Sequence, residues 1–172
     1  MNSELGRISA DRYRTLPGSG IVVVLDNVRS ALNVGSVFRS SDAFKVDKVY
    51  LCGITAVPPS AEIHKSALGA EDSVPWERCA DTVALISGLK AEGFRVVSVE
   101  QTEGAVELGD FRPRSGERLA LVFGNEVDGV SQEAVDASDE SVVIPQWGTK
   151  HSLNVSVAAG VVLWQVRNSM SV

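Results

Sequence analysis

Short apolar runs rich in β-branched residues recur along this chain, and segments of helical character separate them. The first run, 21–25, is continuously apolar, as expected of a strand buried on both faces of a sheet. Four further runs have the same character: 46–52, 94–99, 119–123 and 141–144. Strands that alternate with helices predict an α/β fold, with a mostly parallel sheet flanked by helices.

The first long helix is predicted from its capping residue and its apolar spacing. Asn33 is the expected cap, and the helix runs to about Phe44. Val34, Val37 and Phe38 then form its inner face. Shorter helices are expected at 61–68, between 81 and 93, and at 132–137.

The final helix is predicted to start at Ser152, its cap, and to run to about Asn168. Its apolar stripe consists of Leu153, Val157, Gly160, Val161 and Trp164. No internal repeat and no linker interrupts residues 21–168. The expected organisation is therefore a short N-terminal extension, 1–20, followed by a single domain, 21–172.

The net charge of −6 is unfavourable for binding nucleic acid, because lysine and arginine supply most of that affinity. The charge is unevenly distributed along the chain. Residues 71–140 contain six Lys or Arg against sixteen Asp or Glu, whereas residues 1–70 and 141–172 each carry a net charge of +2. The two ends of the chain therefore allow an RNA-facing surface without requiring one.

Several kinds of protein are excluded by composition. His64 and His151 are isolated, and Cys52 and Cys79 have no metal-ligand spacing, so neither a metal site nor a structural disulfide is expected. No apolar run approaches the roughly 20 residues that span a bilayer, and the first residues lack the apolar core of a secretory signal. We therefore expect a cytoplasmic protein with no membrane contact.

Polar residues and glycines follow three of the predicted strands, where parallel α/β sheets bind ligands. After the first strand come Asn33, Gly35 and Arg39, spaced as N-x-G-x-x-x-R. Gly35 permits another backbone or a nucleotide to come close, and the Arg39 guanidinium suits phosphate. A capped helix with a surface arginine is the plainer interpretation.

The second segment follows the strand at 119–123 and contains Gly124, Asn125, Glu126 and Gly129. Such a turn presents backbone N–H groups to a ligand. It is neither a dinucleotide fingerprint nor a P-loop, because it lacks G-x-G-x-x-G spacing and a Gly-Lys-Ser/Thr sequence. Alone, it is equally a tight connection from strand to helix.

The third segment joins the last strand to the final helix. Ile144 and Pro145 end the strand, and Ser152, Leu153 and Asn154 open the helix. Small residues follow at 158–160, where they allow another part of the chain to pack closely. A capped core helix is the alternative interpretation.

Together, in this order and at these spacings, the three segments resemble the motifs of the SpoU (TrmH-like) family, SPOUT-class RNA 2′-O-ribose methyltransferases. The matching residues are Asn33, Gly35 and Arg39, then Gly124, Asn125, Glu126 and Gly129, then Ile144, Pro145 and 152–155. The resemblance covers roughly residues 21–168. Val127 stands where many members have glycine, and many relatives have an additional N-terminal RNA-binding domain.

The resemblance implies a C-terminal trefoil knot that holds S-adenosylmethionine, although chains are generally unknotted. It implies that a methyl group passes from this cofactor to a ribose 2′-hydroxyl of RNA, without a metal. It also implies a homodimer, with the substrate site at or near the interface. The implied cofactor-binding residues are Phe123, Gly124, Asn125, Gly129, Ile144, Gln146, Ser152 and Leu153.

The implied catalytic residues are Arg39, Asn33, Glu126, Ser152 and Asn154. The family assigns proton removal to the arginine of the first motif, but a guanidinium is effectively always protonated. Arg39 therefore either acts as base with the help of an RNA phosphate, or positions phosphate and ribose while the proton goes elsewhere. Glu126 is the other candidate base, or else it orients Asn33 or Arg39.

RNA contacts are predicted at Arg39 and at Arg7, Arg12 and Arg14, which precede the first strand. A frayed, solvated terminus is the alternative for the last three.

We expect tRNA before rRNA as substrate, because a compact folded RNA suits a small dimeric protein. The rival hypothesis is an RNA-binding module of the same fold without catalysis. A third hypothesis is a nucleotide-binding enzyme of another kind. It would need a loop that binds phosphate, and this sequence contains none of the required form.

Overall fold

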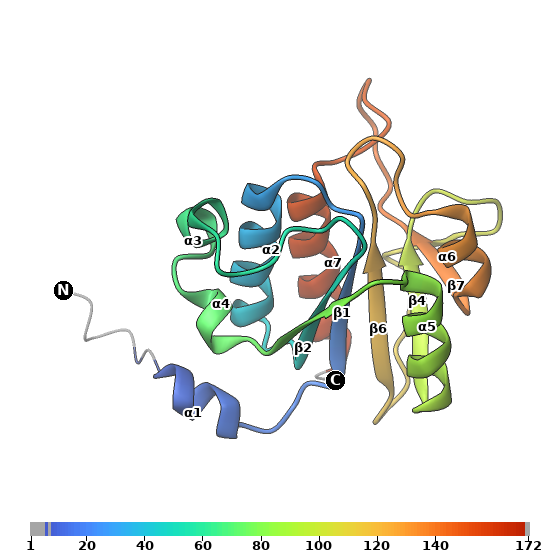
Figure 1. Ribbon diagram of the computed structural model, residues 1–172. Helices are drawn as coiled ribbons and strands as arrows, with labels where there is room; N and C mark the ends of the chain where they lie inside the picture. Colours follow the sequence, from blue (N-terminus) through green and yellow to red (C-terminus); the bar gives the residue numbers. More distant parts are fainter. Residues whose placement is uncertain (1–5, 7, 171–172) are drawn as a thin grey trace.

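A computed structural model describes residues 6 and 8–170 as a seven-stranded sheet between two layers of helices (Figure 1). The strands are β1 (Ile21–Asp26), β2 (Lys48–Cys52), β3 (Trp76–Cys79), β4 (Phe94–Val99), β5 (Val106–Glu107), β6 (Arg118–Phe123) and β7 (Glu140–Val143). The helices are α1 (Ala10–Thr15), α2 (Ala31–Ala43), α3 (Ala61–Ala67), α4 (Ala70–Ser73), α5 (Thr82–Ala91), α6 (Gln132–Ala137) and α7 (Val155–Met170).

The strands lie in the order β3-β2-β1-β6-β4-β7-β5, and each pair of neighbours is parallel. Side chains of β1 alternate between two cores. Ile21, Val23 and Leu25 face the layer of α2, α3 and α7, whereas Val22 and Val24 face α5 and α6. The predicted α/β class, the parallel sheet and the flanking helices are confirmed. The knotted path stays an expectation from the resemblance.

The predicted caps of the two long helices were wrong by two or three residues, whereas the cap predicted for α5, Asp81, is confirmed. Ser30, not Asn33, caps α2, because its hydroxyl oxygen accepts a hydrogen bond from the Asn33 backbone N–H at 3.2 Å. Asn154, not Ser152, caps α7, and its side-chain oxygen accepts from the Ser156 backbone N–H at 2.9 Å. Several serines and asparagines precede each helix, and spacing alone does not select among them.

The predicted apolar stripe of α7 is its outer face. Val157, Val161 and Trp164 are 51%, 40% and 57% exposed. The residues of α7 that are buried are Val155, Ala159, Val162, Leu163 and Val166. This helix has two apolar stripes, so periodicity alone does not identify the one that packs on the sheet. Gly160 instead lies against Ser40 of α2.

Four short elements were missed from the sequence: α1, α4, β3 and β5. The edge strand β3 carries charged and exposed residues, so it lacks the apolar signature of the central strands. The predicted N-terminal extension contributes Tyr13 to the core, because its ring is buried and its hydroxyl donates to the Val46 carbonyl at 3.2 Å.

Cys52 and Cys79 are register neighbours in β2 and β3, and both are free thiols. Within the described part of the chain, no group of three or more His, Cys, Asp or Glu residues is arranged to hold a metal ion. Nor does any helix of that part have the length and apolar character needed to cross a membrane.

Candidate active site

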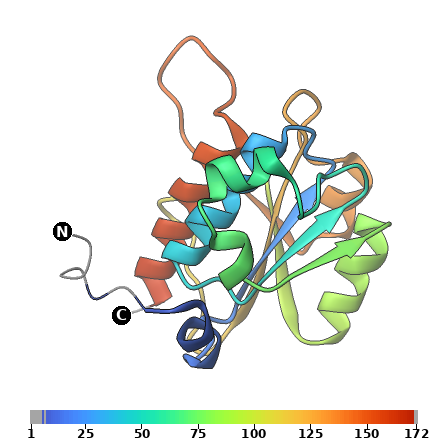
Figure 2. The same cartoon turned by 60° about the vertical axis from the view of Figure 1, so that its left-hand side comes forward.

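A cavity of about 600 Å³ opens at the carboxyl ends of β4, β6 and β7. Its lining consists of residues 99–101, 123–129, 142–146, 148, 150–155 and 158. Two walls stand out, namely the 124–129 turn, which follows β6, and the 146–153 loop, which precedes α7. Both rise from the same end of the sheet, and the loop extends furthest from it (Figure 2).

All eight residues that the sequence predicted as cofactor-binding line this one cavity: Phe123, Gly124, Asn125, Gly129, Ile144, Gln146, Ser152 and Leu153. They come from three separate parts of the chain. The parallel sheet brings them together, because it aligns the carboxyl ends of β6 and β7 on either side of β4.

Hydrogen bonds within the protein hold the 124–129 turn. The backbone groups of Asn125 and Gly129 pair in both directions at 2.9 Å. The Asn125 side-chain oxygen accepts from the backbone N–H groups of Val127 and Asp128, at 2.8 and 3.2 Å. The prediction that this turn offers its backbone N–H groups to a ligand is therefore wrong for these four residues, whose N–H groups are already bonded.

Both glycines of the turn are required by its packing. A Cβ on Gly124 would overlap the backbone of Gly129 and Val130. Gly129 has a φ of 71°, and a Cβ there would overlap the Glu100 carboxylate. Val127 is exposed at the tip and does not have a positive φ, so valine fits where many relatives have glycine.

The 146–153 loop is built in the opposite way. All eight of its residues are exposed, and none makes a hydrogen bond to another described residue. Ser152 belongs to this loop and lines the cavity without capping α7. The loop therefore offers polar groups that protein partners do not occupy.

Glu126 binds the start of α2 from the tip of the turn. Its carboxylate accepts from the backbone N–H groups of Arg29 and Ser30, each at 3.0 Å, and from the Asn33 side-chain amide at 3.1 Å. Partial burial acts to raise the pKa of Glu126, but the hydrogen bonds from Ser30, Arg29 and Asn33 outweigh it and hold the pKa below its usual range. A carboxylate bonded in this way is a poor proton acceptor, which favours a positioning role.

Asn33 connects all three sequence motifs. It donates to Glu126, which lies 93 residues away, and its side-chain oxygen accepts from the Asn154 amide, 121 residues away, at 3.1 Å. We call Glu126, Asn33 and Asn154 the three-motif network. Glu126 and Asn154 also line the cavity, whereas Asn33, which bonds to both, is not part of the lining.

Arg39 lies outside the cavity lining, on the exposed outer side of α2. Its side chain has no hydrogen-bond or ion-pair partner among the described residues.

Gly35 packs against α3, where a Cβ would overlap Ser66 and the Ile63 carbonyl. Of the two roles predicted for Gly35, the close approach of another backbone is therefore the one observed.

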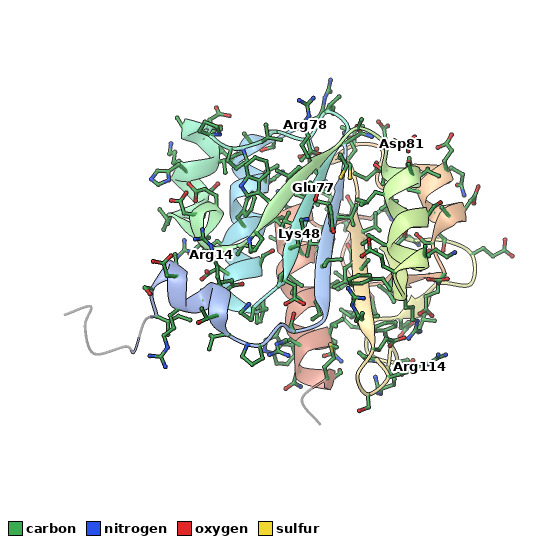
Figure 3. All side chains as sticks on the ribbon, turned by 60° about the horizontal axis from the view of Figure 1, so that its bottom comes forward. Arg14, Lys48, Glu77, Arg78, Asp81 and Arg114 are labelled. Atoms are coloured by element: carbon green, nitrogen blue, oxygen red, sulfur yellow. The ribbon has the colours of Figure 1, made fainter. Side chains whose placement is uncertain are left out.

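The N-terminal arginines lie far from this cavity. Arg7 falls outside the described residues, and α1 lies near the amino ends of the strands (Figure 1). Arg14 donates to the Asp72 carbonyl of α4 and pairs with Asp11 at 3.5 Å (Figure 3). The Arg12 side chain is exposed and has no partner among the described residues.

Two residues that support the site were missed from the sequence. Glu100 follows β4, lines the cavity and accepts from the Val130 backbone N–H at 3.0 Å. Asn27 follows β1, and its carbonyl accepts from the Asn125 side chain at 2.8 Å. Each lies just beyond a predicted strand, so attention to every carboxyl end in the sheet would have found them.

Taken together, these features define an α/β domain with a ligand cavity at the carboxyl ends of a parallel sheet. Residues 20–164 match the SpoU rRNA Methylase family, and the chain belongs to that family. The predicted family is thereby confirmed.

The comparison with solved structures and curated proteins agrees. The A. aeolicus TrmH/SpoU tRNA modifying enzyme is 29% identical with a TM-score of 0.82, over 94% of this chain and 82% of that one. The AdoMet bound rRNA methyltransferase from Sinorhizobium meliloti is 30% identical with a TM-score of 0.82, over 91% and 59%. The 23S rRNA (guanosine-2′-O-)-methyltransferase RlmB of Vibrio vulnificus is 31% identical over 86% of this chain and 58% of its own length. The chain thus spans about three fifths of the length of the curated relatives it matches.

Proposed function

We propose that this protein transfers a methyl group from S-adenosylmethionine to a ribose 2′-hydroxyl of RNA. The observation that carries the proposal is the three-motif network, which joins Asn33, Glu126 and Asn154 beside a cavity of ligand size. A purely structural role does not require three distant motifs to meet at the edge of a cavity. The names of the relatives, an rRNA 2′-O-methyltransferase and a tRNA modifying enzyme among them, support the same activity.

The cavity fits S-adenosylmethionine in size and in chemistry. Its volume of about 600 Å³ lies within the usual range for small-molecule sites, roughly 300–1,000 Å³. Adenine needs apolar walls and directional hydrogen bonds, which Phe123, Ile144 and Leu153 and the unbonded polar groups of the 146–153 loop supply. When bound, the cofactor supplies an electrophilic methyl group on a sulfonium. A solved relative is described as AdoMet bound, which supports this assignment.

In this proposal the protein acts mainly by orienting two reactants. Glu126 fixes Asn33 and the start of α2, and Asn33 in turn fixes Asn154 at the cavity. Glu126 is not the base, because three N–H donors already occupy its oxygens. Arg39 holds the phosphate beside the reacting ribose, with a guanidinium that no protein group neutralises among the described residues. Proton removal through Arg39 remains the competing mechanism.

We further propose a homodimer that covers the outer face of α2 and α7. Exposed Val157, Val161 and Trp164 lie on α7, next to the helix that carries Arg39. Three exposed apolar side chains on one helix face are typical of an interface core. A substrate site near that interface, as the resemblance implies, would bring Arg39 to bound RNA. Sedimentation should detect a dimer, and a stable, active monomer at micromolar concentration would contradict this proposal.

The substrate is proposed to be tRNA rather than rRNA. Its support is the similarity to the solved tRNA modifying enzyme, at 29% identity and a TM-score of 0.82. We also propose a cytoplasmic location, which an RNA substrate of this kind supports. Mapping of methylated riboses by mass spectrometry, in RNA from cells with and without the protein, will identify the RNA and the nucleotide.

The decisive experiment has two parts. Calorimetry without added metal should detect S-adenosylmethionine binding, and single-turnover assays should detect methylated ribose in unmodified tRNA. Arg39→Lys keeps the charge but loses the bidentate hydrogen bonding of the guanidinium to phosphate. Methyl transfer should therefore fall at least about 100-fold while cofactor binding stays normal. Near-equal rates would remove Arg39 from the site. Cofactor and RNA binding without any methyl transfer would favour the alternative, a catalytically inactive RNA-binding module.

A further inference from the structure

We propose that Trp147 is a stacking platform for an unpaired base of the RNA substrate, and that Lys150 in the same loop contacts a phosphate beside it. The inference rests on the proposed function, because it assigns the RNA of that reaction to a specific part of the cavity rim. It adds a substrate class: RNA in which a base near the methylated ribose is free to leave its helix.

The placement of Trp147 is the first observation. Gln146 and Gly148, on either side of it, line the cavity, whereas Trp147 does not. Its side chain is 93% exposed, the largest exposed fraction among the large hydrophobic residues described. The indole therefore lies at the rim of the cavity and outside the space that the cofactor would fill. Figure 2 shows its loop projecting beyond the rest of the sheet end.

A single exposed hydrophobic residue on a protein surface usually needs no explanation. Trp147 differs because of what surrounds it. The loop also carries Lys150 and His151, both exposed and without a partner among the described residues. No aspartate or glutamate occurs anywhere in residues 141–172. Lys150 and His151 line the cavity, three and four residues beyond Trp147. An indole and an uncompensated cation in one loop are the combination that single-stranded nucleic acid binds, through its bases and its phosphates.

The local charge favours a polyanion at this loop, because residues 141–172 contain Lys150 and Arg167 and no Asp or Glu. Charge alone does not distinguish RNA from an acidic protein surface; the indole does, because RNA also offers bases on which it can stack. An aromatic side chain stacks on any base, because every base has a flat π face, and such stacking requires a base that is not paired in a duplex.

The absence of internal hydrogen bonds in the loop suits the same role. Residues 146–153 make none to the other described residues, so Trp147 is carried on a segment that can adjust to its ligand. Cofactor on one side of the loop and RNA on the other would then order it together. Trp147 is a specificity residue in this scheme, because it contacts the substrate and takes no part in methyl transfer itself.

The test compares Trp147→Ala with Trp147→Phe in the full chain. Trp76→Ala is the matched control, since it removes the same side chain from the edge strand β3, outside the cavity lining. The RNA probes are an unmodified tRNA, a short single-stranded oligoribonucleotide, and the same oligoribonucleotide annealed to its complement. Each variant is measured for RNA affinity, for S-adenosylmethionine affinity and for methyl transfer to the tRNA at saturating cofactor.

Trp147→Ala should weaken binding of the tRNA and of the single strand by about 10- to 100-fold, the scale of one lost base stack. Binding of the duplex and of S-adenosylmethionine should not change. Trp147→Phe should restore most of the affinity, and RNA should quench tryptophan fluorescence in the wild type and in Trp76→Ala much more than in Trp147→Phe. The KM for tRNA should rise in Trp147→Ala with little change in kcat.

Several outcomes would overturn the inference while leaving the proposed function intact. These are unchanged RNA affinity in Trp147→Ala, an equal loss for single strand and duplex, and a loss of cofactor affinity or dimerisation instead of RNA affinity. If the wild-type protein itself neither binds nor methylates RNA, the proposed function fails, and this inference fails with it.

Discussion

The two walls of the cavity are built in opposite ways. The 124–129 turn is held by backbone pairing, by the Asn125 side chain and by close packing of two glycines. The 146–153 loop has no hydrogen bonds to other described residues, and all its side chains are exposed. One wall is therefore fixed by the protein itself, whereas the polar groups of the other have no protein partner among the described residues.

This difference separates two tasks that a binding site has to perform. A fixed wall sets the position of a reactive group, because its geometry costs nothing to reach at the moment of binding. An open wall lets ligands enter and leave, and its polar groups stay available for them. The three-motif network extends the fixed wall, since Glu126 ties the turn to α2 and Asn33 ties α2 to the first residue beyond the loop.

Replacing one glycine by alanine in each wall should give the largest difference between the two walls, in both stability and cofactor affinity. Gly124→Ala places its methyl group into the backbone of Gly129 and Val130, so the turn must move. We expect a loss of about 1–3 kcal/mol in stability and a fall in S-adenosylmethionine affinity of about 100-fold, measured by thermal unfolding and calorimetry. Gly148→Ala is the control in the open wall, where a Cβ meets nothing within 4 Å. Equal effects of the two substitutions would remove the distinction between the walls.

Hydrogen exchange should separate the walls directly. In the free protein the amides of the 146–153 loop should exchange fast, whereas those of Asn125, Val127, Asp128 and Gly129 are bonded and should be protected. S-adenosylmethionine should slow exchange in the loop at least about 10-fold and change the turn little. Helix α5, on the other face of the sheet, serves as the internal reference. Strong protection of the loop without ligand would show that it is not an open wall.

Much of this site was accessible from the sequence, and the reason lies in the sheet. Strand signals at 21–25, 94–99 and 119–123 indicated which residues follow each carboxyl end, so Gly124 and Glu126 were placed correctly at the edge that holds the cavity. The motif resemblance then supplied the second wall. Ile144 and Leu153 line the cavity as expected.

Side-chain partners and buried helix faces that depend on tertiary packing could not be predicted from the sequence in the same way. Asn33 was expected to cap the helix, with its orientation by Glu126 as one of two roles for that carboxylate; the bond to Glu126 is observed, whereas the cap is wrong and the bond to Asn154 was not foreseen. Nothing local distinguishes these two uses of an asparagine. The inward stripe of α7 was chosen wrongly for a related reason, because Val157 and Val162 are equally apolar and only the packed sheet selects between them.

Glu126→Gln tests whether the fixed wall needs a charged acceptor. The amide keeps one oxygen but turns an NH₂ group toward a backbone donor, so we expect methyl transfer to fall about 10-fold with cofactor affinity nearly unchanged. The pKa of Glu126 is lowered in the folded protein, so the carboxylate stabilises the fold above its ordinary value of 4.5. That contribution is lost as the pH falls through the folded-state pKa. The difference in Tm between wild type and Glu126→Gln should therefore be present at pH 7 and shrink below about pH 4.5; a difference that stays constant with pH would contradict the role.

Val127→Gly should have the smallest effect, although it changes the central motif. Val127 lies at the tip of the fixed wall with 82% of its side chain exposed, and it does not have a positive φ. Its backbone N–H is held by Asn125 whichever side chain is present. Glycine therefore gains nothing in the folded state, while it adds freedom to the unfolded chain, so stability should fall by about 0.4–1 kcal/mol. Cofactor affinity should change by less than about twofold, because the hydrogen bonds that fix the turn are unaltered. Denaturant unfolding and calorimetry measure both quantities. A large gain in affinity would mean that valine distorts the turn, and a large loss would mean that its side chain contacts the cofactor. Either result would show that the geometry of this wall depends on the side chain at its tip, and not only on Asn125 and the two glycines.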